Sequence, residues 1–248
     1  MKDNKNLFAA ELGEKLYPIL AEDYFNRTKI SSLNFLTMKK IILNYINNRP
    51  KKKLNILDWG CGNSLWSFGL FPGSNITGID TSKKCLYYSK ENAIINSSEF
   101  KGLLYSKDFL KVKSNYYDYA IAIALIELVD NKNFTKIFTK IYESLKPDAL
   151  LFLTHHTYRP FSAVYLPWLI RGGYSALRKQ MKMDVQRKST KEIIRELKEI
   201  GFCYIDSGAF NPYPSKLWKY VSSDFGYLVK NKFIKSWYYT QYIVLKKS

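Results

Sequence analysis

The sequence predicts an α/β protein with a doubly wound, mostly parallel sheet, in a single domain over residues 1–248. Short apolar runs alternate with segments of helical periodicity through most of the 248 residues, and this rhythm implies right-handed crossovers between parallel strands. In addition, a glycine-rich turn containing Gly60 and Gly62 stands between the first apolar run and a helix. Such a turn in the first βαβ unit is typical of a nucleotide-type cofactor site.

The first half of the chain supplies four strands and the helices between them. Residues 1–33 are expected to form one or two short helices that end in a polar link. A helix is expected over 35–47, where apolar residues such as Met38 and Ile42 follow the spacing of a helix packed on a sheet. Ser82 is the predicted cap of a helix that continues to about Ile95. The expected strands are 54–57, 75–79, 102–106 and 119–125.

The second half completes the sheet and interrupts the alternation twice. An amphipathic helix ends before Pro147, and STKE at Ser189 is a capping box, with Glu192 three residues on. The helix that this box opens ends at Gly201. The expected strands are 149–153, 202–205 and 237–245, and the irregular segments 155–188 and 210–236 are expected to be insertions.

Composition excludes several classes of protein and leaves the partners of this chain open. Cys61, Cys85 and Cys203 have no CxxC spacing, so we predict no disulfide framework and no metal site, and expect a cytoplasmic protein. No apolar run approaches the roughly 20 residues that span a bilayer. The formal charge of +18 suits nucleic acid, an anionic membrane surface or an acidic substrate, although the scattered lysines also fit a lysine-rich proteome.

The glycine-rich turn and two acids carry the chemistry of the candidate cofactor site. Glycine at positions 60 and 62 lets backbone amides approach a ligand without a Cβ in the way. The helix start that follows has a partial positive charge that suits a carboxylate or phosphate. Asp58 ends the first strand and is an acceptor for an ammonium group or a water. Asp80 ends the second strand about 20 residues further on, where an acid accepts from ribose hydroxyls.

The same stretch separates a dinucleotide site from a different cofactor site. A dinucleotide fingerprint requires a third glycine, and that position is Leu65 here. DWGCGNS instead resembles the D-x-G-C-G-x-G motif of the class I S-adenosylmethionine (SAM) methyltransferases, with Ser64 in place of the last glycine. Further segments resemble this family in order: GIDTS at 78–82, KDF at 107–109, the segment 117–131 with Leu128 where many relatives carry histidine, LKPDALLFLT at 145–154, and Gly201 with Phe202.

The resemblance covers about 54–202 and the final strand. It implies a Rossmann-like sheet of seven strands, with an antiparallel last strand and a cap inserted after strand five. It also implies SAM as the cofactor, Asp80 on the ribose, Asp108 facing the adenine amino group, and residues 1–50 as a helical lid. The implied cofactor-binding residues are Asp58, Gly60, Cys61, Gly62, Asn63, Asp80, Thr81, Ser82, Asp108, Phe109, Ala124 and Leu125.

His155 and His156, the only histidines of the chain, are the candidate catalytic residues. They stand at the tip of predicted strand five, at the edge where open α/β sheets bind ligands. An imidazole at this place would deprotonate a hydroxyl or orient a substrate. Because adjacent residues of a strand face opposite sides, we expect at most one of the two to point into the cleft.

The insertion after strand five bears most directly on the acceptor. From 158 to 198 the chain has ten Arg or Lys against three Asp or Glu, mixed with aromatic and aliphatic residues. An amphipathic cap with basic flanks would rest on anionic lipid and admit an apolar substrate, a basic aromatic surface would hold RNA, and a lid would bury its aromatics. We predict a methyltransferase of a small, partly apolar or lipid-like acceptor, cytoplasmic or peripheral to the membrane. An RNA methyltransferase and a non-catalytic scaffold of the same fold are the alternatives.

Overall fold

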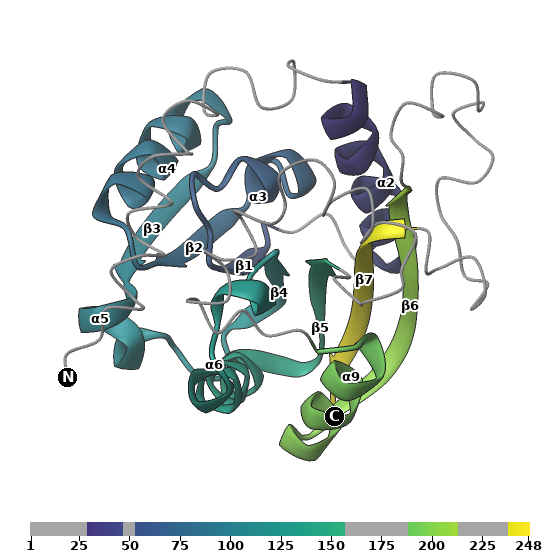
Figure 1. Ribbon diagram of the computed structural model, residues 1–248. Helices are drawn as coiled ribbons and strands as arrows, with labels where there is room; N and C mark the ends of the chain where they lie inside the picture. Colours follow the sequence, from purple (N-terminus) through teal and green to yellow (C-terminus); the bar gives the residue numbers. More distant parts are fainter. Residues whose placement is uncertain (1–28, 47–52, 157–187, 213–237) are drawn as a thin grey trace, which may run out of the picture.

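The computed structural model describes residues 29–46, 53–156, 188–212 and 238–248, which build one seven-stranded sheet in the order β3-β2-β1-β4-β5-β7-β6 (Figure 1). Strand β7 is antiparallel to both β5 and β6, while the other neighbouring strands are parallel. The predicted seven-stranded, mostly parallel sheet with an antiparallel last strand is confirmed. The strands are β1 (Asn55–Trp59), β2 (Asn75–Asp80), β3 (Glu99–Leu104), β4 (Tyr117–Ile123), β5 (Leu145–His156), β6 (Phe202–Pro212) and β7 (Tyr238–Lys247).

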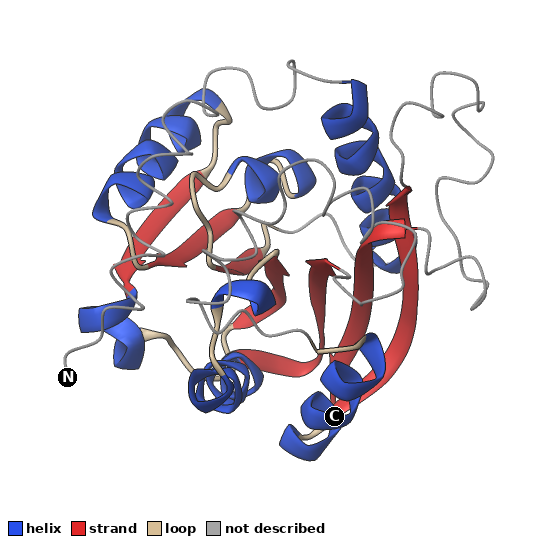
Figure 2. Ribbon diagram, in the orientation of Figure 1, coloured by secondary structure: helices blue, strands red, loops and turns tan. Residues whose placement is uncertain are grey.

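Helices cover both faces of the sheet, and each face has its own apolar core (Figure 2). The helices α2 (Lys29–Ile46), α3 (Leu65–Leu70) and α4 (Lys83–Ile95) cover one face, and α5 (Tyr105–Asp108), α6 (Asn131–Ser144) and α9 (Thr190–Ile200) cover the other. Met38 and Phe68 pack against the first face, whereas Phe138 and Leu197 pack against the second. This double covering explains why β1 and β4 are rich in apolar residues, as strands buried on both faces usually are.

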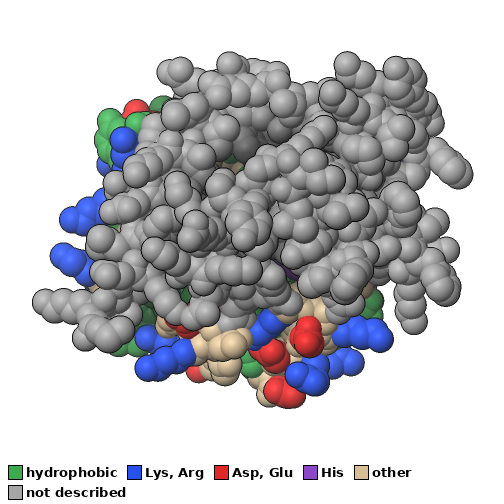
Figure 3. All heavy atoms as spheres, in the orientation of Figure 1, with side chains coloured by type: hydrophobic (Ala, Val, Ile, Leu, Met, Phe, Trp, Pro, Cys, Tyr) green, Lys and Arg blue, Asp and Glu red, His purple; other side chains and the backbone are tan. Residues whose placement is uncertain are grey.

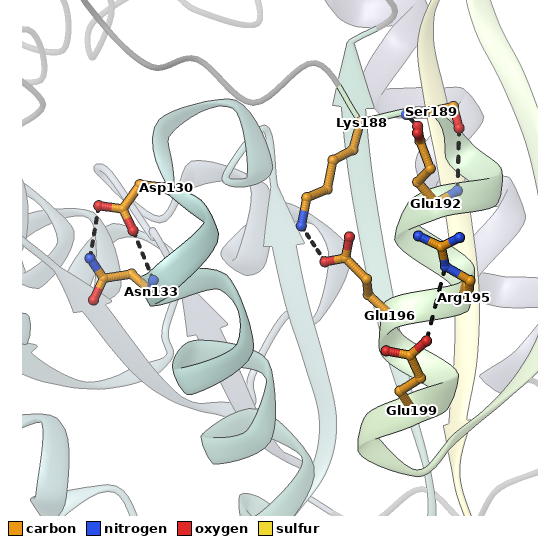
Figure 4. Close-up of polar contacts among 8 residues, drawn as sticks. All are labelled: Asp130, Asn133, Lys188, Ser189, Glu192, Arg195, Glu196 and Glu199. Atoms are coloured by element: carbon orange, nitrogen blue, oxygen red, sulfur yellow. Dashed lines mark hydrogen bonds and ion pairs between the residues drawn. The ribbon is translucent and has the colours of Figure 1, made fainter.

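The helix starts follow the polar caps that the sequence contains. Ser82 accepts a hydrogen bond from the amide of Cys85 at the start of α4. Figure 4 shows the capping box of α9, in which the Ser189 amide donates to the Glu192 carboxylate at 2.6 Å. The same view shows Asp130 capping α6. Each cap satisfies amides that have no partner within the helix. The caps at Ser82 and Ser189 agree with the prediction from the sequence, and the cap at Asp130 is an additional one.

Several predicted bounds are wrong in the first half of the chain. The third strand runs from Glu99 to Leu104 instead of 102–106, because β3 is a mostly exposed edge strand whose apolar pattern is weak. The fourth strand ends at Ile123 instead of 125, because Ala124 takes a φ of 51°, which is incompatible with extended backbone. In addition, residues 29–33 belong to α2 rather than to a polar link.

Two further corrections concern the insertions at 155–188 and 210–236. Strand β5 continues through His156 and β6 through Pro212, because both pair with β7 along their length. Residues 155–156 and 210–212 are therefore parts of strands. The segments 157–187 and 213–237, which hold the rest of the two predicted insertions, lie outside the described residues. So do residues 1–28 and 47–50 of the lid predicted over 1–50.

Charged side chains of both signs are interspersed on the described surface that Figure 3 shows at the α6 and α9 end of the molecule. One such place is the i, i+4 pair of Arg195 with Glu199 on α9 (Figure 4). Among the described helices, none is both long enough and apolar enough to cross a membrane.

Candidate functional site

The glycine turn after β1 lies where the strand order reverses between β1 and β4, the usual ligand-binding edge of such sheets. Gly60 and Gly62 have φ values of 74° and 51°, which glycine adopts without strain. The amides of Gly60 and Cys61 donate to the Ile79 carbonyl at 2.8 and 3.1 Å. A Cβ on Gly60 would stand 2.8 Å from Cδ1 of Leu125, so this turn needs glycine both for its backbone angles and for space.

Asp80 is joined to the glycine turn by its carboxylate. Oδ2 accepts from the Gly62 amide at 2.9 Å, and Oδ1 accepts from the Ser82 amide at 2.8 Å. Burial raises the pKa of the Asp80 carboxyl, and the hydrogen bonds from Ser82 and Gly62 partly oppose that effect. The backbone amide of Thr81 also donates to this carboxylate. The arrangement is an oriented, partly buried acceptor pair at the end of β2.

Asp58 is the second acid of the site and is buried deep at the end of β1. Its Oδ2 accepts a hydrogen bond from the hydroxyl of Ser67 in α3. Burial raises the pKa of Asp58 to about 7, against the hydrogen bond from Ser67, and the nearby charge of Asp80 raises it further. An acid in this state releases its proton readily when a cation arrives.

Three other predicted cofactor residues build the turn. The Cys61 thiol is buried, and burial together with Asp80 and Asp58 raises its pKa well above the usual range. Asn63 is also buried, and its carbonyl accepts from Asn92 of α4 at 3.0 Å. Thr81 is half-buried directly after Asp80. Buried side chains here leave the backbone of the turn as its ligand-facing part.

Three more predicted cofactor residues, of which Asp108 is the one expected to face the adenine, follow the ends of β3 and β4. The Asp108 carboxylate accepts from Lys111 Nζ at 2.6 Å and from the Leu104 amide at 3.0 Å, and the bond to Lys111 is the main reason that the pKa of Asp108 is lowered. Phe109 packs edge-on against Trp59, with 5.7 Å between ring centroids. The Ala124 amide donates to Oγ1 of Thr154 at 3.0 Å. The structure therefore brings these residues to the same edge of the sheet as the glycine turn.

The two histidines have different neighbours, as their alternation along β5 predicts. His155 is buried, and its Nε2 lies 3.1 Å from Oγ1 of Thr190, whose hydroxyl donates to the Gln241 side chain. His156 is only half-buried, and its Nδ1 lies 2.8 Å from Oε1 of Glu127. The backbone amide of His156 donates to the same oxygen.

Glu127 is the residue of this edge that the motifs did not single out. It belongs to η2 (Ile126–Leu128), the short turn after β4, and is 8% exposed. Burial alone would raise the pKa of its carboxyl, but the hydrogen bond and charge of His156 outweigh burial and hold that pKa below its usual range. The only signal in the sequence is its place directly after the fourth strand, next to Leu128.

The strand order, the antiparallel β7 and the glycine turn held against an acid at the end of β2 together define the class I SAM-dependent methyltransferases. A family model described as "Methyltransferase domain" matches residues 50–216. The chain therefore belongs to the methyltransferase-domain family, and it is a SAM-dependent enzyme. The predicted fold, enzyme class and cofactor are confirmed.

Individual relatives are distant. The chain is 25% identical over 202 residues to the ubiquinone biosynthesis O-methyltransferase of Pelagibacter ubique. This match covers 77% of this chain and 78% of that protein. It is 26% identical over 150 residues to the malonyl-[acyl-carrier protein] O-methyltransferase of Acetivibrio thermocellus, over 59% of this chain and 49% of that one. The magnesium protoporphyrin IX methyltransferase of Synechocystis, solved with bound S-adenosylhomocysteine, has the same fold, with a TM-score of 0.63 and 14% identity over 99% of this chain and 100% of that chain.

Proposed function

We propose that the chain transfers the methyl group of SAM to a small, partly apolar or lipid-like acceptor. The residues around the glycine turn fit the cofactor. In support, backbone amides of Gly62, Thr81 and Ser82 orient the Asp80 carboxylate at the end of β2, where an acid accepts from ribose hydroxyls. Bound SAM supplies an electrophilic methyl group on a sulfonium ion.

The other predicted cofactor residues surround Asp80 in this proposal. Asp58 and Asp80 offer negative charge to a cofactor that carries positive charge, and burial makes that attraction strong. The turn at Gly60 and Gly62 lets the backbone lie close to the ligand without a Cβ in the way. Leu125 borders the turn from the end of β4. The remaining proposed contacts are Cys61, Asn63, Thr81, Ser82, Asp108, Phe109 and Ala124.

The acceptor proposal is supported by the relatives, whose names include a ubiquinone biosynthesis enzyme and a malonyl-[acyl-carrier protein] enzyme. Both names describe O-methyltransferases, and neither name refers to a nucleic acid.

Titration calorimetry with SAM and S-adenosylhomocysteine tests the cofactor site. Asp80→Ala should weaken SAM binding at least 10-fold, because hydrogen bonds to a charged acceptor contribute about 1.5–3 kcal/mol each. Glu99→Ala is the matched control, since this exposed carboxylate lies at the opposite end of neighbouring β3. Unchanged SAM affinity in Asp80→Ala, or no binding by the unaltered protein, would contradict the proposal.

A screen of cell extracts with isotopically labelled SAM tests the acceptor. Label in a low-molecular-weight or lipid fraction is the expected result. Label in RNA, together with a steeply salt-dependent affinity for tRNA, would refute the small-molecule proposal. Flotation with anionic liposomes then separates a membrane-bound acceptor from a freely dissolved one.

A further inference from the structure

We propose that His156 is the base that removes a proton from the acceptor, that Glu127 positions it, and that the acceptor is therefore a hydroxyl compound. This inference rests on the methyl transfer proposed above and deepens it, because it names the chemical class of the substrate and two residues that act on it.

The first argument is the way in which Glu127 holds His156. Its Oε1 receives two N–H groups of this one residue, the backbone amide and Nδ1 of the ring. Because a carboxylate only accepts hydrogen bonds, Nδ1 must carry a proton, and Nε2 is then the basic nitrogen of the neutral ring. A carboxylate that holds an imidazole in this tautomer is the arrangement that serves general-base histidines in hydrolases.

The second argument is where the pair lies. Leu125, two residues before Glu127, is the side chain that a Cβ on Gly60 would touch, so the turn carrying Glu127 borders the cofactor turn. The Ala124 amide bonds the Thr154 side chain, two residues before His156. This bond joins the end of β4 to the end of β5. Ala124 also has a φ of 51°, a conformation that costs a non-glycine residue about 1–2 kcal/mol and is typical of functional turns.

The third argument is the state of Glu127 itself. Its Oε2 is buried and has no hydrogen-bond partner within the part of the chain that the structure describes. A carboxylate kept only to join two strands would be expected to have both oxygens satisfied, because an unsatisfied buried oxygen is costly. The pKa of Glu127 nevertheless stays below its usual range, so the group keeps its charge beside the ring at neutral pH.

His155 does not fit the role of the base. Its Nε2 faces Oγ1 of Thr190, and that hydroxyl gives its own proton to Gln241, so Nε2 of His155 is the donor. The ring is also buried between β5 and α9. His155 is thus a member of the network that joins α9 to β7.

A base at this place identifies the acceptor by its chemistry. The acceptor oxygen forms a bond to the methyl carbon while the carbon–sulfur bond breaks, its proton passes to Nε2 of His156, and the sulfonium leaves as a neutral thioether. A carboxylate acceptor has no proton to lose, and an amine reacts as its neutral form and releases a proton afterwards. A hydroxyl gains most from a positioned base, typically about 10²–10⁴-fold in rate.

The tautomer is tested without any acceptor, by NMR of protein labelled with ¹⁵N-histidine. The chain has two histidines, so His155→Gln and His156→Gln assign both rings. At pH 8 we expect His156 as the Nδ1–H tautomer and His155 as the Nε2–H tautomer, with Glu127→Gln changing only the His156 signals. The proposal would be overturned by an Nε2–H tautomer for His156. It would also be overturned if the His156 signals were the same in Glu127→Gln as in the unaltered protein.

The chemical role is tested with catechol and with 4-nitrocatechol, which is already ionised near neutral pH. Glu127→Gln and His156→Gln should each lower kcat about 100-fold with catechol and less than 10-fold with 4-nitrocatechol, with an unchanged KM for SAM. Glu143→Gln, an exposed carboxylate on α6, is the matched control.

Two results would overturn the role of the pair. One is an equal loss of kcat with both catechols. The other is turnover of octanoate or octylamine in a panel in which no hydroxyl compound is methylated. Failure of SAM to bind in the calorimetry above would instead refute the proposed function, and it would leave the tautomer result standing.

Discussion

Replacing Asp58 with asparagine removes a buried ionisable group and keeps a side chain of the same size beside Ser67. The pKa of Asp58 is raised from 3.8 to about 7, mainly by burial. Because the folded pKa lies above the unfolded one, the protonated acid favours folding, and this stability is lost as the pH rises from about 4 to about 7. Above pH 7 the protein without cofactor must keep a buried, ionised carboxylate.

The size of the effect follows from this pair of pKa values. At about 1.4 kcal/mol for each pH unit, ionised Asp58 costs the folded protein on the order of 4 kcal/mol at pH 8.5 and about 2 kcal/mol at pH 5.5. The uncharged amide of the variant would cost the same at both pH values. We therefore expect Asp58→Asn to gain about 2 kcal/mol relative to the unaltered protein between pH 5.5 and 8.5, which for this chain length is roughly 4–8 °C in Tm.

Thermal unfolding at these two pH values, without cofactor, is the assay. Ser67→Ala is a useful companion, because it removes the hydrogen bond to Asp58 and leaves the acid in place. Adding SAM should reduce the difference in Tm between Asp58→Asn and the unaltered protein at pH 8.5, because the cationic cofactor favours the ionised acid. If Tm changed equally with pH in Asp58→Asn and in the unaltered protein, Asp58 would not titrate near pH 7. That result would refute the expected gain in stability.

Three further substitutions test the local structure. Gly60→Ala should lower the free energy of unfolding in urea by about 1–3 kcal/mol more than Gly73→Ala does. Both glycines have a similar positive φ, but only at Gly60 does the added Cβ meet Leu125. Equal losses in the two variants would mean that the contact with Leu125 is not tight. Ser64→Gly should stabilise the protein by about 1 kcal/mol, because Ser64 has a φ of 55° at the start of α3, and a loss of stability would show that the serine side chain contributes more than its backbone costs. Ser189→Ala should lower the free energy of unfolding by about 0.5–2 kcal/mol through the lost cap. The affinity for SAM should stay unchanged, and a large change in that affinity would mean that α9 contributes to the cofactor site.

The elements that the sequence predicted well are those governed by local chemistry. The capping box at Ser189 and the cap at Ser82 each depend on residues within a few positions of one another. The bounds that were wrong depend on distant pairing: β5 and β6 are longer than their apolar runs because β7 pairs with both. No local pattern at 155–156 or 210–212 carries that information.

The candidate site divides in the same way. Asp58 and Asp80 could be found because a recognisable motif surrounds each of them in the sequence. Glu127 could not, because its partner His156 is 29 residues away and the two meet only when β4 and β5 lie side by side. The departure at Ser64 was visible in the sequence, but its backbone angle, the reason that glycine suits this position, was not.

The carboxylates of Asp58, Asp80 and Glu127 differ in whether a positively charged group of the protein contributes to their pKa. Within the described residues, no cation of the protein is among the causes that set the pKa of Asp58 or Asp80, and burial raises both. Glu127 is similarly buried, yet its pKa is lowered, because His156 provides the opposite charge. Two acids that lack an internal cation are suited to a cationic ligand that arrives and leaves. Glu127, whose Oε1 already receives two N–H groups of His156, is suited to holding that ring in place through the reaction. This is the division of work between cofactor binding and proton removal that we propose.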